Sequence, residues 1–234
     1  MEELRLVEQY PSIQGEGPRV GEMTQFIRFA GCDMRCPGWP CDTAFASNPK
    51  IWGKEGNSYK MTPAELLTTT DGFRERSGAK NICLTGGEPF MQDNELLKQY
   101  VGSLKSKGYT IEAFSNGSFL YPSWALNDIS FVMDWKLSGS GEGSTKIINR
   151  TINASRLKPK DSIKFVVTGK EDFTEAKSIY RDLKELTPAT FWIGAAWDKV
   201  TNYEILSFVT KNKLPWKLNV QLHKFIWDPD KRGV

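Results

Sequence analysis

The chain has 234 residues, of which 39% are hydrophobic, 12% aromatic and 25% charged. This balance is typical of a globular protein and excludes a disordered or fibrous chain. The formal charge of +3 is too weak to indicate a nucleic-acid or membrane-surface partner. No apolar run approaches the ~20 residues of a membrane helix, and residues 1–5 show no secretory signal. We therefore expect a cytoplasmic protein that acts on a small molecule.

Short β-branched and aromatic runs predict strands along the whole chain, with helical patterns between several of them. One helix start is marked by Thr62 as N-cap, Pro63 at the first helical position and Glu65 three residues on. In chain order we expect strands Leu4–Gln9 and Thr24–Phe29, a helix from Thr62, strand Asn81–Thr85, helix Asp93–Lys107, strands Thr110–Phe114, Phe131–Asp134 and Ser162–Val167, helix Asp172–Leu186, strand Phe191–Ile193, helix Asn202–Lys211 and strand Lys217–Leu222.

The alternation of strands and helices predicts an α/β fold with a mostly parallel sheet. A full eight-fold barrel takes ~250 residues, and this chain shows fewer helix signals than strand signals. We therefore expect a partial or modified (β/α) TIM-type barrel. Ala44–Lys60 and Ser138–Ser144 are linker-like in composition but too short to separate domains, so residues 1–234 are predicted to form a single domain.

Three of the four cysteines, Cys32, Cys36 and Cys41, fall within ten residues with C-x3-C-x4-C spacing. They follow the strand Thr24–Phe29, at the end where α/β folds place their functional sites. One zinc ion could be held there if Cys83 or the single His223 supplied a fourth ligand. A 4Fe–4S cluster with one open iron needs only the three clustered thiolates. Cys83 lies in an apolar strand, where a cysteine is usually a small core residue.

Polar groups follow several other predicted strands at the same end. Gly86-Gly87-Glu88-Pro89 offers free backbone amides and a carboxylate that could take an ammonium group. Ser115-Asn116-Gly117 and Asp134-Trp135-Lys136 follow the next two strands. Such a row of strand ends is typical of a cofactor site.

The N-terminal loop and the chain's far end add further candidates. Gln14 and Glu16 offer an amide and a carboxylate that suit an amide- or guanidine-like ring edge. Arg28, inside a strand, needs an anionic partner, either a local glutamate or a substrate carboxylate. His223 is expected at the end of the last strand, as a structural residue or as a ligand contact.

The cysteine loop together with Gly86–Pro89 resembles the radical S-adenosylmethionine enzymes, whose usual motif is C-x3-C-x2-C. Within that superfamily, Gln14–Gly17, Gly31–Cys36, Cys41–Thr43 and Gln221–Lys224 resemble the 7-carboxy-7-deazaguanine synthase family. The resemblance covers nearly the whole chain. The x4 gap departs from the usual motif, and we expect the cluster to assemble but the loop's contact with the adenine to differ.

The resemblance implies that Cys32, Cys36 and Cys41 hold a 4Fe–4S cluster, with S-adenosylmethionine on the open iron. Thr43 is implied to ligate a magnesium ion shared with the substrate. The residues implied to line the S-adenosylmethionine pocket are Pro40, Asp42, Gly86, Gly87, Glu88, Ser115, Asn116, Asp134, Trp135, Lys136, Gly194, Ala195, Ala196 and Trp197.

The implied reaction is that of a lyase. It converts 6-carboxy-5,6,7,8-tetrahydropterin to 7-carboxy-7-deazaguanine with loss of ammonia, after one electron cleaves S-adenosylmethionine to a 5′-deoxyadenosyl radical. Glu16 and Arg28 join the three cysteines as implied catalytic residues. The implied partners are a flavodoxin- or ferredoxin-type electron donor and a second copy of the chain. The implied substrate contacts are Ile13, Gln14, Gly15, Glu16, Arg28, Thr85, His223 and Val234.

Two other functions remain open at this point. One is a zinc-stabilised binding module without catalysis. The other is a radical activase of another enzyme, which would share the cluster and the glycine turn. Such an activase has no evident need for Gln14, Thr43 or His223 in a small-molecule pocket.

Overall fold

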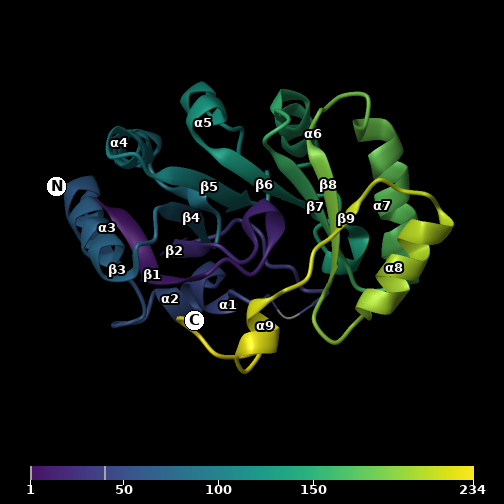
Figure 1. Cartoon of the computed structure of the whole chain (residues 1–234), viewed down its shortest axis with the longest axis horizontal. Coiled ribbons are helices and arrows are strands. Elements are labelled where there is room, and N and C mark those ends of the chain that lie inside the picture. The colour runs from purple at the N-terminus through teal and green to yellow at the C-terminus, as the bar shows by residue number, and fades with distance from the viewer. Residues whose placement is uncertain (1, 40) are drawn as a thin grey trace.

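The chain folds into a nine-stranded sheet with helices on both sides (Figure 1). The computed structural model describes residues 2–39 and 41–234. The strands are β1 (Leu4–Ile13), β2 (Met23–Phe29), β3 (Tyr59–Met61), β4 (Asn81–Gly86), β5 (Thr110–Ser115), β6 (Ser130–Trp135), β7 (Ser162–Val167), β8 (Thr190–Ala195) and β9 (Lys217–Leu218). The helices are α1 (Ala44–Ser47), α2 (Pro49–Trp52), α3 (Pro63–Ser77), α4 (Asn94–Ser106), α5 (Ser123–Asp128), α6 (Ile147–Arg156), α7 (Lys170–Leu183), α8 (Asn202–Lys211) and α9 (His223–Ile226).

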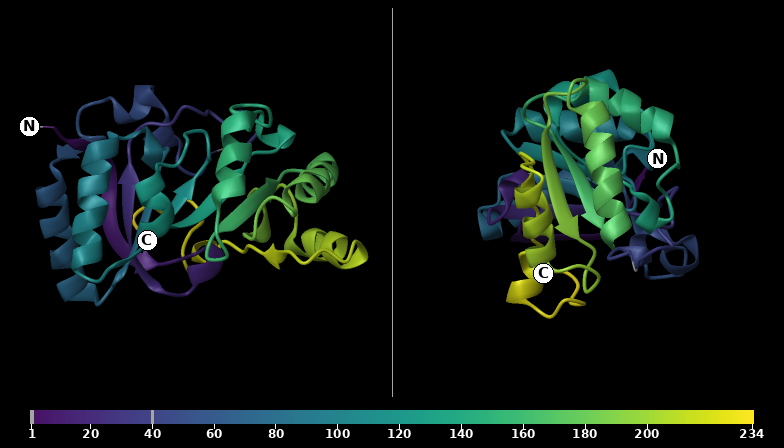
Figure 2. Two further views of the ribbon diagram at one scale, coloured as in Figure 1. Left: turned by 90° about the horizontal axis from the view of Figure 1, so that it is seen from above. Right: turned by 90° about the vertical axis from the view of Figure 1, so that its right-hand side faces the viewer.

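The sheet runs in the order β3-β1-β2-β4-β5-β6-β7-β8-β9. β1 is antiparallel to β2 and β3, and every other neighbouring pair is parallel. Over the described residues no ladder joins β3 to β9, so the sheet stays open. This confirms the expected partial (β/α) barrel. Helices α3 to α8 follow one side of the curved sheet, and α1, α2 and α9 lie on the other (Figure 1, Figure 2).

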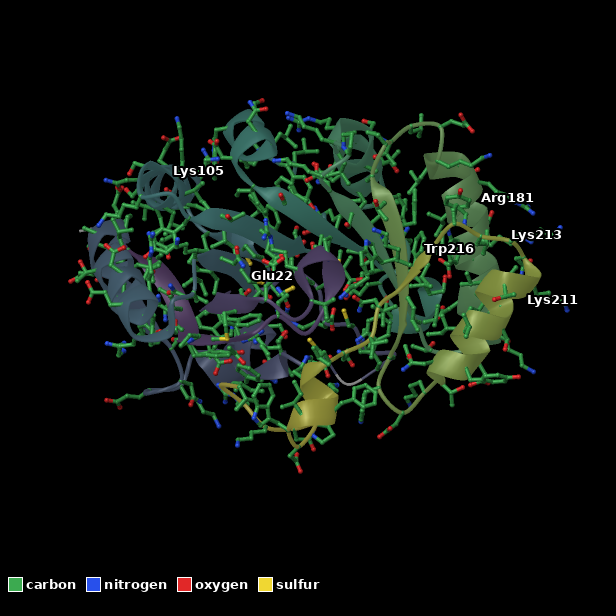
Figure 3. All side chains as sticks on the ribbon, in the orientation of Figure 1. Glu22, Lys105, Arg181, Lys211, Lys213 and Trp216 are labelled. Atoms are coloured by element: carbon green, nitrogen blue, oxygen red, sulfur yellow. The ribbon has the colours of Figure 1, made fainter. Side chains whose placement is uncertain are left out.

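The core lies between the sheet and the long helices. Buried residues such as Leu84 on β4 and Tyr100 on α4 belong to one continuous apolar cluster, which follows from the helical spacing of apolar side chains on α4. Trp216, labelled in Figure 3, packs 5.5 Å from the rings of both Phe165 and Tyr180 and joins β7 to α7.

The labelled cations lie on the outer helices. Lys105 is on α4, Arg181 on α7, and Lys211 and Lys213 lie at the end of α8 (Figure 3).

Local signals placed several helix ends correctly. Thr62 and Glu65 form the reciprocal capping box expected at the start of α3. Asp93 caps α4, and Gly108, with φ +73, follows its end. α7 begins at Lys170 and ends at Leu183. The prediction of a helix over Asp172–Leu186 was therefore two to three residues too far toward the C-terminus.

Other expectations were wrong. The linker-like stretch Ala44–Lys60 contains α1, α2 and part of β3. The last strand is only Lys217–Leu218, and His223 begins α9 instead of ending a strand. The reason is that, beyond Asn219, the backbone leaves β8: the Leu222 amide donates to the Gly15 carbonyl over 2.9 Å. Among the helices of the described residues, none is both long enough and apolar enough to cross a bilayer.

Candidate active site

A cavity of about 740 Å³ opens at the C-terminal ends of the parallel strands. It gathers residues from the N-terminal loop, the cysteine loop, the ends of β4, β5, β6 and β8, and the C-terminus. The predicted site residues that line it are Ile13, Gln14, Gly15, Glu16, Arg28, Cys32, Cys36, Cys41, Asp42, Thr43, Thr85, Gly86, Gly87, Ser115, Asn116, Asp134, Lys136, Gly194, Ala195, Ala196, Trp197, His223 and Val234. Glu88 and Trp135 lie behind this lining, and Pro40 lies outside the described residues.

All three clustered cysteines are free thiols on the cavity wall. Cys32 Sγ accepts from the Met34 amide over 3.4 Å and lies 3.6 Å from Asn116 Nδ2. Cys41 Sγ lies 3.5 Å from the Thr43 hydroxyl. Cys36 has φ +46, a left-handed conformation that an L-residue adopts only when its surroundings hold it there. The loop thus directs three thiols from one short stretch of chain into one space.

Burial keeps the thiols of Cys32 and Cys36 protonated. It raises the pKa of Cys32 to about 12 and that of Cys36 to about 11, with nearby Lys136 opposing the shift at Cys36. Iron ligation would have to displace the protons, as metal binding by thiols generally does. Over the described residues, no three His, Cys, Asp or Glu side chains converge on a single metal-ion position.

The turn after β4 joins the cysteine loop to β5. The Gly87 amide donates to the Phe29 carbonyl over 3.0 Å, and the Glu88 amide donates to the Gly31 carbonyl over 2.7 Å. A Cβ on Gly87 would overlap the Gly31 carbonyl oxygen, so only glycine allows this approach. The backbone of the turn is therefore fixed directly beneath the cysteine loop.

Glu88 is fully buried and binds groups of the chain itself. Its carboxylate accepts from the Phe90 amide over 3.1 Å, the Ser115 hydroxyl over 2.9 Å and the Asn116 amide over 2.7 Å. Burial outweighs these bonds and raises the pKa of Glu88 to about 7. The side chain holds the end of β5 in place behind the cavity wall.

Thr43 stands between the cysteine loop and the glycine turn. Its hydroxyl donates to the Gly86 carbonyl over 3.0 Å. The hydroxyl oxygen keeps lone pairs for a hard cation such as Mg²⁺.

On the opposite wall, Glu16 forms a buried ion pair with Lys164. Its Oε2 lies 2.7 Å from Lys164 Nζ, and its Oε1 accepts from Gln221 Nε2 over 2.9 Å. Burial alone would raise the pKa of Glu16, but the Lys164 ammonium and these hydrogen bonds lower it to about 2. Glu16 is therefore a carboxylate throughout the physiological pH range.

Lys164 also reaches toward the strand end of β6. Asp134 is its register partner on the neighbouring strand, with 3.7 Å between Nζ and Oδ2. The same Asp134 oxygen lies 2.9 Å from Lys136 Nζ. Since side chains alternate along a strand, Asp134 and Lys136 face the cavity while Trp135 is buried on the other face.

The N-terminal loop is bound to the C-terminal segment. Besides the bond from Leu222 to Gly15, the Gly17 amide donates to Asn219 Oδ1 over 2.9 Å. The His223 imidazole lies so close to Gly15 that an added Cβ would overlap it. Burial lowers the pKa of His223, which therefore stays neutral at neutral pH.

Arg28 has the local glutamate partner that the sequence allowed. Its Nε lies 2.8 Å from Glu8 Oε1, and its Nη2 donates to the Tyr10 hydroxyl over 3.1 Å. A guanidinium has five N–H donors, so donors remain for a ligand anion. Glu8 also lies 3.2 Å from Arg232, which brings the C-terminal tail and Val234 across to β1 (Figure 1).

The buried carboxyl of Glu112 binds the N-terminal loop through Gln14. Gln14 Nε2 donates to Glu112 Oε1 on β5, and Glu112 is the register partner of Cys83 on β4. Burial raises the pKa of Glu112 to about 7. Cys83 is 1% exposed and belongs with this buried group instead of with the cysteine loop.

Comparisons with known proteins show the family to which the chain belongs. A family model described as "4Fe-4S single cluster domain" matches residues 13–158. A protein of Clostridium acetobutylicum, 7-carboxy-7-deazaguanine synthase, is 35% identical over 98% of this chain and 99% of its own length. A protein of the same name from Methanospirillum hungatei is 32% identical over 97% of this chain and 86% of its own length. The chain belongs to the 7-carboxy-7-deazaguanine synthase family.

The crystal structure of QueE from Escherichia coli shares the fold, with a TM-score of 0.73 at 21% identity over 94% of this chain and 95% of that one. The family model and the two relatives confirm the family resemblance expected from the sequence. The residues fit the cluster that this family's matching domain is named for, because three unpaired thiols line one cavity. The cysteine spacing left open a zinc ion or a 4Fe–4S cluster, and family membership decides for the 4Fe–4S cluster.

Lys164 and Glu112 are among the charged residues near the cavity that were missed in the sequence. Lys164 interrupts the apolar run Ser162–Val167, and Glu112 interrupts Thr110–Phe114. A charged residue in an otherwise apolar buried strand rarely occurs without a partner, and that was the available signal. The partners, Glu16 and Gln14, lie far away in sequence and are found only in the structure.

Gly15→Ala is expected to lower kcat/KM for the substrate about tenfold or more, because the new methyl group would displace the His223 imidazole. Steady-state kinetics and iron analysis check this, and the cluster content should stay unchanged. Gly102→Ala is the control, since Gly102 lies in α4 with open space around it. Normal kinetics for Gly15→Ala would contradict the placement of His223.

Glu112 is expected to make stability fall as pH rises toward neutrality. Because its pKa is raised, the carboxyl of Glu112 keeps its proton in the folded state at pH values where the unfolded chain has already lost it. The free energy of unfolding therefore falls as the pH rises from the ordinary carboxyl pKa to about 7. Glu112→Gln removes this titration and keeps an acceptor for Gln14.

Denaturant unfolding at acidic and slightly alkaline pH measures the effect. Relative to Glu112→Gln, the wild type should lose about 1 to 3 kcal/mol of unfolding free energy across the window. The exposed Glu185→Gln should behave as wild type. Equal pH slopes for wild type and Glu112→Gln would contradict the prediction.

Proposed function

We propose that this protein converts 6-carboxy-5,6,7,8-tetrahydropterin to 7-carboxy-7-deazaguanine with release of ammonia. It acts as a lyase of the radical S-adenosylmethionine type in 7-deazapurine, queuosine-type biosynthesis. The observation that carries the proposal is that the three clustered thiols and the Gln14–Glu16 loop line the same cavity. The names of the relatives in Clostridium acetobutylicum and Methanospirillum hungatei support it.

On the cofactor side, Cys32, Cys36 and Cys41 bind three irons of a 4Fe–4S cluster and leave the fourth open to S-adenosylmethionine. When bound, the cluster supplies the electron that cleaves this cofactor to a radical. The backbone at Gly87 and the side chain of Asn116 line the space beside the thiols. The remaining cofactor contacts are proposed at Pro40, Asp42, Gly86, Ser115, Asp134, Trp135, Lys136, Gly194, Ala195, Ala196 and Trp197, with Glu88 fixing Ser115 and Asn116 from behind.

On the substrate side, Glu16 accepts hydrogen bonds from the guanidine-like edge of the pterin. Lys164 keeps this carboxylate charged and fixes its direction. Arg28 binds the substrate carboxylate with the donors that Glu8 and Tyr10 leave free. Neutral His223 closes the pocket over Gly15, with Ile13, Gln14, Thr85 and Val234 as the other contacts.

Magnesium is proposed to bind at Thr43, between the cofactor and substrate sides. Mg²⁺ prefers oxygen ligands and usually keeps several waters, so one hydroxyl and a substrate carboxylate suffice on the ligand side. The Thr43 hydroxyl would then turn its lone pair toward the ion while still donating to the Gly86 carbonyl.

The wider setting is proposed on the same basis. Residues 1–234 form a single radical S-adenosylmethionine domain that acts in the cytoplasm as a homodimer. A flavodoxin- or ferredoxin-type protein supplies the electron. No direct nucleic-acid or membrane partner is needed for a reaction on a free pterin.

The direct test is turnover by the protein reconstituted with iron and sulfide under anaerobic conditions. With the carboxytetrahydropterin, S-adenosylmethionine, Mg²⁺ and a chemical reductant, mass spectrometry should detect 7-carboxy-7-deazaguanine and 5′-deoxyadenosine. Cluster-loaded protein that forms neither product would contradict the proposal.

Cys36→Ala should abolish cluster assembly and leave a folded chain, because two thiols on this loop cannot hold the cluster. Iron and sulfide analysis with the visible spectrum measures assembly, and circular dichroism measures folding. The matched control is Cys83→Ala, which removes a buried thiol that lies outside the cysteine loop. Full iron content in Cys36→Ala would refute the ligand assignment.

Thr43→Ala should raise the Mg²⁺ concentration needed for half-maximal activity about tenfold, since one oxygen ligand is lost. Its iron content should equal that of wild type. Thr43→Ser keeps the hydroxyl and should restore most of the Mg²⁺ response. Wild-type behaviour of Thr43→Ala at low Mg²⁺ would show that the metal binds elsewhere.

A further inference from the structure

The described residues of the wide gap between Cys36 and Cys41, residues 37–39, pack against residues 136–145, here called the brace segment. The Gly38 amide in the gap donates to the Ser140 carbonyl over 3.0 Å. A Cβ on Gly38 would overlap backbone of the brace segment, so the two stretches meet main chain to main chain. The glycine- and serine-rich composition that made this stretch linker-like allows that close contact.

The neighbours of Gly38 make the same contact. A Cβ on Gly141 would come within 2.6 Å of Pro37 Cγ, so the proline ring lies directly on that glycine. Lys136 Nζ lies 5.2 Å from the centre of the Trp39 ring. Each described residue of the gap, 37–39, therefore contacts the brace segment.

Glu142 of the brace segment binds the cysteine loop on the other side of Cys36. Its Oε1 accepts from the Arg35 amide over 2.8 Å, and its Oε2 accepts from the Thr145 hydroxyl over 2.5 Å. Burial raises the pKa of Glu142, but the hydrogen bonds from the Thr145 hydroxyl and from the amides of Arg35 and Cys36 together outweigh it, so the net pKa is lowered. The carboxylate thus holds the backbone at the point where Cys36 takes its left-handed conformation.

The brace segment is itself fixed by a fully buried arginine. Arg150 on α6 lies 5.3 Å over the Trp135 ring and has no exposed surface. Its guanidinium donates to four carbonyl oxygens at both ends of the segment: Lys136 (2.8 Å), Glu142 (3.0 Å), Gly143 (2.6 Å) and Thr145 (2.6 Å).

Helix α7 holds the middle of the segment. Asp172 accepts from the Gly139 amide over 2.9 Å, and Glu175 accepts from the Ser138 amide over 2.8 Å. The shape of the brace segment therefore depends on α6 and α7 and not on the cysteine loop alone.

We propose that the brace segment positions the C-x4-C loop for its cluster, with Glu142 as the direct positioning residue and Arg150 as the residue that shapes the segment. The inference rests on the proposed function. Two extra residues between the second and third ligands give Cys41 more freedom relative to Cys36 than the two-residue gap of the usual motif. The contacts at Arg35 and residues 37–39 remove that freedom before the cluster binds.

The test compares wild type with Glu142→Ala and Glu142→Gln, reconstituted anaerobically. The readout is the rate at which each protein loses iron to a chelator, followed by visible absorbance. Outer-shell partners of metal ligands typically contribute 10–100-fold in metal affinity, so Glu142→Ala should lose iron about tenfold faster. Glu142→Gln keeps an acceptor for Arg35 and should fall between. The exposed Glu185→Ala should match wild type.

Thermal unfolding of the iron-free proteins separates positioning from general stability, and Glu142→Ala should unfold close to wild type. Gly38→Ala tests the same contact from the cysteine-loop side and should also lose iron faster. Wild-type iron retention in both Glu142→Ala and Gly38→Ala would overturn the inference alone. A wild-type protein that holds no cluster would overturn the proposed function, and the inference with it.

Discussion

The buried ion pair between Glu16 and Lys164 is the interaction on which the site depends. It joins residues 148 positions apart across the cavity, with 2.7 Å between the charged atoms. Leaving either charge buried without its partner would cost several kcal/mol, so the N-terminal loop and β7 have to meet. Because Asp134 lies beside Lys164 in strand register, the same ammonium also connects the proposed substrate wall to the proposed cofactor wall.

The direction of the strands explains why these groups can meet at all. In a parallel sheet every strand delivers its following loop to the same edge, and here that edge receives the cysteine loop, the Gly86–Glu88 turn and the ends of β5 and β6. The Gly87 and Glu88 amides then donate hydrogen bonds to the carbonyls of Phe29 and Gly31, and these bonds fix the position of the cysteine loop relative to the end of β4. The C-terminal tail lines the same cavity, and Cζ of Arg232 in this tail lies 3.6 Å from the centre of the Phe45 ring on α1.

Short-range patterns in the sequence were sufficient to predict the individual strands, the main helices and the cysteine loop, because each depends on neighbours within a few residues. The alternation of strands and helices along the chain then predicted the parallel sheet. Because parallel strands all end at the same edge of the sheet, the sequence also predicted that the polar residues after these strands lie close together. Lys164 and the function of the stretch Ser138–Ser144 could not be predicted, since each depends on contacts between distant segments that only the topology brings together. His223 was placed on a strand for the same reason: its backbone neighbours bind the N-terminal loop and not β8.

The central claim is that the cluster thiols and the Glu16 wall serve a single reaction space. The most direct measurement is the electron paramagnetic resonance spectrum of the reduced, reconstituted protein, recorded alone, with S-adenosylmethionine, and with the carboxytetrahydropterin added to that complex. The spectrum should change when S-adenosylmethionine binds the open iron and change again when the pterin binds beside it. A spectrum that responds to neither molecule, or a pterin that binds without altering it, would contradict the shared cavity.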